Sequence, residues 1–218
     1  MKITLLSVAL LTCCTTGAWA DVLLYDNTTT DTLDTVLYSV GPYIALGDQI
    51  ELSSSGIANQ AQVQLFNAGD AGTFDAELDL YNIGSPVGSL LGTSTLAGIS
   101  STGSDVINLV FDLAGIAVSQ DLIFLVTINN ADPNLDLGVD MFEPPTVGSS
   151  DNLYMIVGTT GPVFSQIDTN SENVYFQLSG TPTVASAAPE MPDQILLVAG
   201  LLALGLLYKP LAIMRRSI

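Results

Sequence analysis

The chain has 218 residues with 22 Asp and Glu, four Lys and Arg and no His, which gives a formal net charge of −18. The absence of His excludes Ser-His-Asp and Cys-His catalytic sites and His-containing zinc or copper sites. All four cations lie near the chain ends. The long central segment therefore has no side chain to neutralise phosphates, which excludes nucleic acid as a partner.

The first twenty residues have the composition of a secretory signal peptide. Lys2 supplies the positive start, residues 3–11 form an apolar core, and Ala18 and Ala20 form a small-x-small cleavage site. We expect the Sec translocon and signal peptidase to process this segment, so that the mature chain begins at Asp21.

Both cysteines of the chain, Cys13 and Cys14, lie inside this leader. Cys13 follows an apolar stretch, which leaves lipoprotein processing as an alternative to cleavage after Ala20. Cleavage after Ala20 removes both cysteines, so the exported protein would have no disulfide although its compartment permits one.

Residues 21–180 are predicted to form one all-β domain, an antiparallel β-sandwich of the jelly-roll kind. Apolar and polar residues alternate through much of this region, which is the pattern of half-buried antiparallel strands. The segment 122–128 is apolar on both faces and is predicted to be the central strand. The predicted strands cover residues 22–25, 36–40, 49–52, 60–65, 74–81, 90–96, 106–111, 122–128, 137–142, 154–157 and 174–178.

Three carboxylates, Asp75, Glu77 and Asp79, alternate with apolar residues and should share one face of a strand. Paired carboxylates could serve a glycosidase as nucleophile or base and as general acid. Like charges on a strand are also typical of a solvated outer face that blocks edge-to-edge aggregation. No apolar pocket is indicated nearby in the sequence, so we predict that the protein is not an enzyme.

Oxygen-bearing side chains occupy alternate positions in the segment 132–140, at Asp132, Asn134, Asp136 and Asp140. That spacing allows a short loop to wrap a hard cation such as calcium, which would offset part of the negative charge. The segment lacks the glutamate and the glycine position of an EF-hand, and its composition is also typical of a turn between strands. Both interpretations stay open, and no other cofactor is expected.

Extracellular polysaccharide is an alternative partner, because some jelly rolls are lectins and Tyr presents an apolar ring with a polar tip. The only Trp lies in the leader, so stacking in the mature chain would rely on the smaller Tyr ring. The tyrosines available for this role are Tyr25, Tyr38, Tyr43, Tyr81, Tyr154 and Tyr175.

The C-terminal region carries a second set of delivery signals. Residues 181–188 are small or Pro and predict a linker, and residues 195–214 predict a transmembrane helix. Twenty helical residues reach about 30 Å, the thickness of a bilayer core. Lys209, Arg215 and Arg216 place the C-terminus in the cytoplasm and the acidic domain outside.

A short motif, Pro189-Glu190-Met191-Pro192, precedes this Leu-, Gly- and Ala-rich helix and its basic tail. The arrangement resembles the PEP-CTERM sorting signal of exported proteins of Gram-negative bacteria. In that family a membrane-embedded transpeptidase, the exosortase, recognises the signal and the helix is removed. The resemblance covers residues 189–218 and implies exosortase as a partner, with Pro189, Glu190 and Pro192 as its recognition motif. Met191 departs from the pattern.

The domain itself resembles the choice-of-anchor domains that often precede such signals. The Asp26-Asn27 pair, residues 47–50 and above all residues 142–150, with their Pro-Pro-Thr-Val-Gly-Ser-Ser run, carry this resemblance. It implies a β-sandwich and an exported location, with no settled activity. The sequence therefore predicts a non-enzymatic surface or extracellular-matrix protein of the cell envelope, made as a single-pass membrane precursor.

Overall fold

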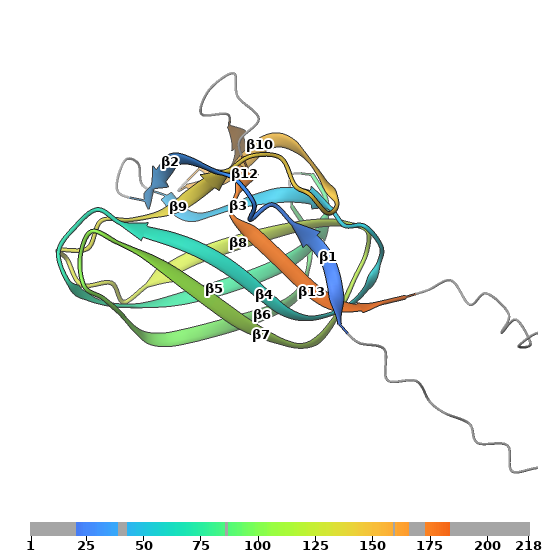
Figure 1. Cartoon of the computed structure of the whole chain (residues 1–218), viewed down its shortest axis with the longest axis horizontal. Helices are drawn as coiled ribbons and strands as arrows, with labels where there is room; N and C mark the ends of the chain where they lie inside the picture. The colour runs from blue at the N-terminus through green and yellow to red at the C-terminus, as the bar shows by residue number, and fades with distance from the viewer. Residues whose placement is uncertain (1–20, 39–42, 86, 159, 166–172, 184–218) are drawn as a thin grey trace, which may run out of the picture. The chain divides into compact units, whose positions relative to one another are not determined.

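The computed structural model describes residues 21–38, 43–85, 87–158, 160–165 and 173–183. The chain divides into two compact units, residues 1–183 and 184–218, and the second lies wholly outside the described residues. The described part is all-β, as predicted (Figure 1). Its strands are β1 (Val22–Asp26), β2 (Asp31–Leu37), β3 (Tyr43–Glu51), β4 (Gly56–Asn67), β5 (Gly72–Ile83), β6 (Val87–Ser101), β7 (Asp105–Val118), β8 (Asp121–Asn129), β9 (Leu137–Phe142), β10 (Ser149–Gly158), β11 (Gly161–Ser165), β12 (Asn173–Val174) and β13 (Phe176–Pro182).

The strands form two antiparallel sheets that enclose one core, consistent with a β-sandwich. Sheet A has seven strands in the order β1-β13-β4-β9-β12, with β7 paired to β4 and β2 paired to β9. Sheet B has six strands in the order β11-β10-β3-β8-β5-β6. The structure therefore confirms the predicted antiparallel, two-layer architecture.

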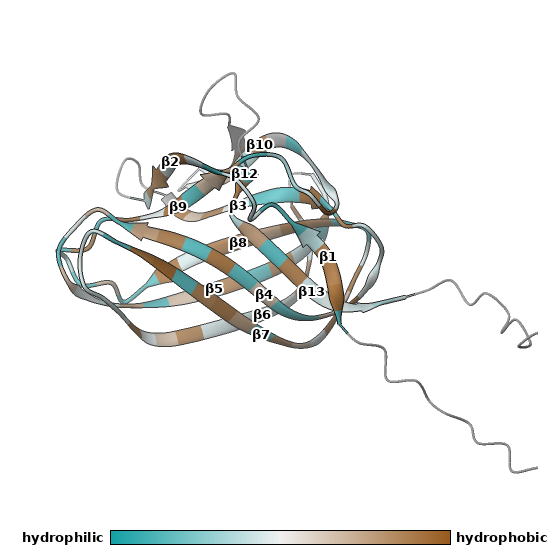
Figure 2. Ribbon diagram, in the orientation of Figure 1, coloured by the Kyte–Doolittle hydropathy of each residue, from teal (hydrophilic) through white to brown (hydrophobic). Residues whose placement is uncertain are grey.

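Alternation of side chains along the strands explains why these segments pair in this register. In β4, Ala61, Val63 and Leu65 are buried, while the Gln residues between them lie on the other face. The alternation is visible as brown and teal bands along β4 and β13 (Figure 2). A shift by one residue would expose the apolar set, so burial of one face specifies the register.

The core lies between the sheets, and aromatic rings join them. Phe124 of β8 stacks on Phe176 of β13 with ring centroids 3.8 Å apart. Strand β8 lies between β3 and β5, and its residues from Leu122 to Val126 are buried. The outward side chains Ile123 and Leu125 form a second small apolar cluster with Ala45 and Met155. The prediction of a central strand that is apolar on both faces is confirmed.

Stability must come from this burial, because residues 21–183 contain no Lys or Arg with which to form ion pairs. Each large apolar side chain taken out of water contributes about 1.5–3 kcal/mol. Backbone hydrogen bonds of the two sheets supply most of the polar contacts. The acidic side chains add hydrogen bonds to turns rather than salt bridges.

The Pro-Pro-Thr-Val-Gly-Ser-Ser run connects β9 to β10 and holds β1 against them. The backbone N–H groups of Thr146 and Val147 both donate to the carbonyl of Asp26, at 2.7 and 3.2 Å. Gly148 then turns the chain with a φ of 81°, where a Cβ would lie 2.4 Å from the carbonyl oxygen of Glu51. The run thus has a structural role that only glycine allows at this position.

The sequence did not predict the short strand β11, and its predicted strand 174–178 merged the end of β12 with β13. Strand β13 extends through Thr181 and Pro182, two residues into the segment that the sequence assigned to a linker. Within the described residues, no helix has the length and apolar character needed to cross a bilayer. The helix predicted for residues 195–214 lies outside them.

Candidate functional site

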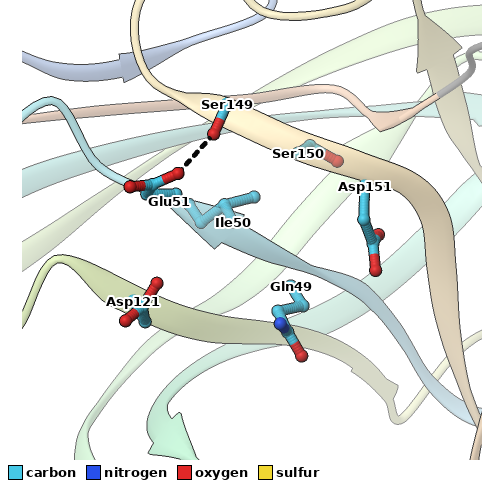
Figure 3. A pocket seen from close by; sticks show the side chains of 7 residues that line it. All are labelled: Gln49, Ile50, Glu51, Asp121, Ser149, Ser150 and Asp151. Atoms are coloured by element: carbon cyan, nitrogen blue, oxygen red, sulfur yellow. Dashed lines mark hydrogen bonds between the residues drawn. The ribbon is translucent and has the colours of Figure 1, made fainter.

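A bulge in β10 opens a polar pocket at the β3 edge of the strand. Ser150 pairs with Ile50 and Tyr154 with Asp48, so three residues of β10 face one residue of β3. The resulting pocket has a volume of about 220 Å³. Its lining residues are Gln49, Ile50, Glu51, Asp121, Ser149, Ser150 and Asp151 (Figure 3).

The three carboxylates of this pocket come from β3, β8 and β10 and spread around it (Figure 3). Ser149 Oγ donates to Glu51 Oε2 at 2.7 Å, and Gln120 Nε2 donates to Glu51 Oε1 at 3.1 Å. Nowhere in the described residues do three or more Asp, Glu, Cys or His side chains gather in a group that could hold a metal ion. The pocket therefore presents acceptors individually rather than as a metal cage.

Ser150 links this pocket to a buried polar cluster between the sheets, which we call the Asp48 cluster and define as Tyr25, Asp48, Ser150 and Asn173. Tyr25, Asp48 and Asn173 are each 0% exposed. The Ser150 hydroxyl donates to Asn173 Oδ1 and also lies beside Tyr25 and Asp48. The cluster joins β1, β3, β10 and β12, so it is formed by tertiary contacts alone.

Three buried side-chain nitrogen or oxygen atoms in the described structure have no hydrogen-bond partner, and all three belong to this cluster. They are Tyr25 Oη, Asp48 Oδ2 and Asn173 Nδ2. Leaving a buried polar atom unpaired costs about 1–3 kcal/mol. Such groups are rare in native proteins. The Asp48 cluster is therefore the most unusual polar site of the domain.

Burial is the main cause that raises the pKa of Asp48 well above its usual range, and the charge of Asp151 adds to it. The backbone N–H of Gln49, which donates to Asp48 Oδ1 at 2.7 Å, opposes the shift. Burial likewise raises the pKa of Tyr25. Asp48 thus keeps its proton to a higher pH than an ordinary carboxyl group.

The predicted calcium segment is divided between a loop and a strand. In the loop, Asp132 Oδ2 accepts from the backbone N–H and hydroxyl of Thr73, at 2.6 and 3.1 Å. The carbonyls of Asn134 and Asp136 accept from the backbone of the β4–β5 turn. These contacts anchor the loop as a turn, and the calcium proposal stays a prediction for solution experiments.

Asp140 lies apart from this loop, on the outer face of sheet A. It is buried in β9, and Thr35 Oγ1 of β2 donates to its Oδ1 at 2.9 Å. Burial raises the pKa of Asp140, with Thr35 opposing and Asp31 adding to the shift. Asp140 is one wall of a groove of about 210 Å³ lined by Asp31, Leu33, Thr35, Phe66, Val106 and Asp140.

The carboxylates of β5 do share one face, as predicted, and they are engaged in structural hydrogen bonds. Asp75 accepts from Asn130 Nδ2 at 2.6 Å and from Gly98 N at 2.7 Å, and these contacts lower its pKa. Asp79 accepts from the Thr93 hydroxyl at 2.5 Å. A carboxyl with a lowered pKa is a poor general acid, so Asp75 does not suit that role.

The outer face of sheet A presents a second kind of surface, which we call the amide strip and define as Gln60, Gln62, Gln64, Asn108, Val110 and Gln177. Register places Gln62 between Gln177 of β13 and Val110 of β7. Gln64 Nε2 donates to Asn108 Oδ1 at 3.0 Å. The alternating Gln residues were visible in the sequence as a strand pattern, but their partners on β7 and β13 were not.

The tyrosines proposed for glycan stacking are mostly interior residues. Tyr25, Tyr154 and Tyr175 are buried. Tyr38 donates its hydroxyl to the carbonyl of Val126 at 2.8 Å. Tyr81 is partly exposed and lies next to Asp79, to which its hydroxyl donates at 3.1 Å. The side chain of Tyr43 lies outside the described part of the chain. Phe66 is an aromatic side chain that lines the groove beside Asp140.

The remaining predicted site residues lie outside the described part of the chain: Ala18, Ala20, Pro189, Glu190, Pro192, Lys209, Arg215 and Arg216. No family model, curated protein or solved structure matches the chain. Functional inference therefore depends on the residues of this chain.

Proposed function

We propose that the protein is a non-enzymatic component of the cell surface or extracellular matrix, exported through its leader and sorted by its C-terminal segment. The observation that carries the proposal is the separation of charge along the chain. Every Lys and Arg lies in the two terminal segments with delivery-signal composition, whereas residues 21–183 hold none. A jelly-roll form of the sandwich and removal of the terminal helix by exosortase belong to the same proposal.

The non-enzymatic part of the proposal is supported by the arrangement of the carboxylates. Asp75, Asp79 and Asp132 accept hydrogen bonds from neighbouring turns and strands. The carboxyl with the strongly raised pKa, Asp48, is sealed between the sheets and has no exposed surface. A catalytic acid must reach its substrate, and a sealed carboxyl does not.

Mass spectrometry of the native surface protein tests the proposal. The expected mature chain begins at Asp21 and lacks the terminal helix, and deletion of residues 189–218 should release a folded domain into the medium. A chain that begins at Cys13 would indicate a lipoprotein. A chain that is intact through Ile218 would show a tail-anchored protein and refute sorting by exosortase.

Polysaccharide binding is the second candidate function, and the amide strip favours it. Side-chain amides offer both donors and acceptors, which suits hydroxyl groups. The calcium-dependent form of this function would use the loop that carries Asp132, Asn134 and Asp136. A glycan array in the presence and absence of a chelator distinguishes the two forms from a purely structural role.

A further inference from the structure

We propose that the amide strip, together with the groove that contains Phe66, binds a neutral polysaccharide chain without calcium. The proposal rests on the second candidate function and assigns its site and its ligand class. Export and sorting can fail or succeed independently of it, because they depend on the terminal segments.

The strip is regular enough to accept an extended polymer. Strand β4 pairs with β7 without interruption from Gln60 to Asn67. Outward side chains on one strand repeat every two residues, or about 7 Å. Gln60, Gln62 and Gln64 therefore form a row of evenly spaced amides, and Gln177 and Asn108 widen that row on either side.

These amides keep hydrogen-bonding capacity for a ligand. The bond between Gln64 and Asn108 uses a single donor and a single acceptor of that pair, and Gln177 donates one hydrogen to Asp26. A side-chain amide has two donor hydrogens and two acceptor lone pairs, so each of these amides retains free groups. Gln60 is exposed, and Gln62 and Gln64 are partly exposed.

The groove at the Gln64 end of the strip supplies apolar surface next to a polar group. Phe66 follows Gln64 on the same face of β4, and Val106 of β7 pairs with it. Val106 is 52% exposed and Leu33 is 86% exposed, so apolar surface is available to a ligand. Asp140 forms the polar wall, with its Oδ1 occupied by Thr35. An apolar patch beside a carboxylate suits the apolar face and the hydroxyl edge of a sugar ring.

Charge determines which polysaccharides fit. Carboxylates border the amide strip on both sides: Asp112 of β7 pairs with Gln60, and Asp26 of β1 pairs with Gln177 and accepts from its Nε2 at 3.5 Å. The outer face of sheet B carries Asp75, Glu77 and Asp79 as well. In a chain of net charge −18, an anionic polymer is repelled over most of the surface. A neutral polymer meets no such penalty and can use the amides directly. Because side-chain amides donate to and accept from sugar hydroxyl groups directly, calcium is not needed to bridge the strip to a neutral ligand.

Affinity electrophoresis of the full chain in gels that contain hydroxyethyl cellulose, dextran or alginate tests the proposal. We expect retardation by at least one neutral polymer, none by alginate, and no change with EDTA. Gln62→Ala combined with Gln64→Ala should weaken binding by at least about tenfold, and Phe66→Ala should also weaken it. Gln49→Ala combined with Gln120→Ala removes the same side-chain type outside the strip and should leave binding unchanged.

Unchanged circular dichroism and thermal midpoints would show that the strip variant is folded. Three results would overturn the proposal: no retardation by either neutral polymer, equal binding by the strip variant and the wild type, or loss of binding with EDTA. None of these results bears on the mature termini, which mass spectrometry reads separately.

Discussion

Replacing Asp48 by Asn should stabilise the domain at neutral pH and reduce the dependence of its stability on pH. Asp48 is 0% exposed, and burial raises its folded-state pKa well above the usual range. The folded domain therefore holds a proton that the unfolded chain releases once the pH exceeds about 3.9. Asn has nearly the same shape and carries no titrating proton.

The sign and the magnitude follow from proton linkage. The stability that neutral Asp48 contributes is fully present at pH values below the pKa of this carboxyl group in the unfolded chain. It is lost as the pH rises through the pKa of the same group in the folded domain. In that window the free energy of unfolding falls by up to about 1.4 kcal/mol per pH unit because of this one group. The free energy of unfolding of Asp48→Asn should therefore exceed that of the wild type by up to about 1.4 kcal/mol more with each pH unit.

Urea unfolding followed by circular dichroism between pH 5 and 8 at fixed ionic strength measures the effect. Asp121→Asn is the matched control, because it makes the same substitution at an exposed carboxyl group in the neighbouring pocket. Subtracting the control isolates burial from the general repulsion among carboxylates. If the two variants change the free energy of unfolding equally at every pH, the reasoning about Asp48 is wrong.

Three further changes test the packing, the turn and the charge balance. Phe124→Ala removes the ring stacked on Phe176 and should lower the free energy of unfolding in urea by about 3–5 kcal/mol. Val163→Ala, at a side chain that is 53% exposed, should lower it by under about 1 kcal/mol. Equal losses would contradict the assigned core. Gly148→Ala should destabilise the domain by at least about 1 kcal/mol, because φ is 81° and a Cβ would lie 2.4 Å from the carbonyl oxygen of Glu51. An unchanged thermal midpoint would argue against this turn. Thermal midpoints should rise with sodium chloride, since the Debye length falls to about 3 Å near 1 M; if millimolar calcium at matched ionic strength raises them no further, the loop at Asp132 is only a turn.

The local pattern of apolar and polar residues was sufficient to predict a two-layer β fold. The alternation of Ala61, Val63 and Leu65 with Gln residues determined which face of β4 is buried, because successive strand residues point to opposite sides. The continuous apolar run of β8 likewise indicated burial on both faces. A two-residue strand such as β12 has no period to detect, so the sequence alone did not separate it from β13.

The sites depended on contacts between residues far apart in the chain. Asp48 lies near Tyr25 and shares Ser150 with Asn173 only because β1, β3, β10 and β12 converge on the same part of the core, and no local spacing encodes that meeting. Asp132 and Asp140 are close in sequence, yet the start of β9 at Leu137 separates their carboxylates. The sequence by itself therefore determined the strand faces and the uneven charge, through interactions within a few residues. Only the tertiary structure decided which polar side chains are sealed in the core and which line the outer face, because strand register brings distant residues together.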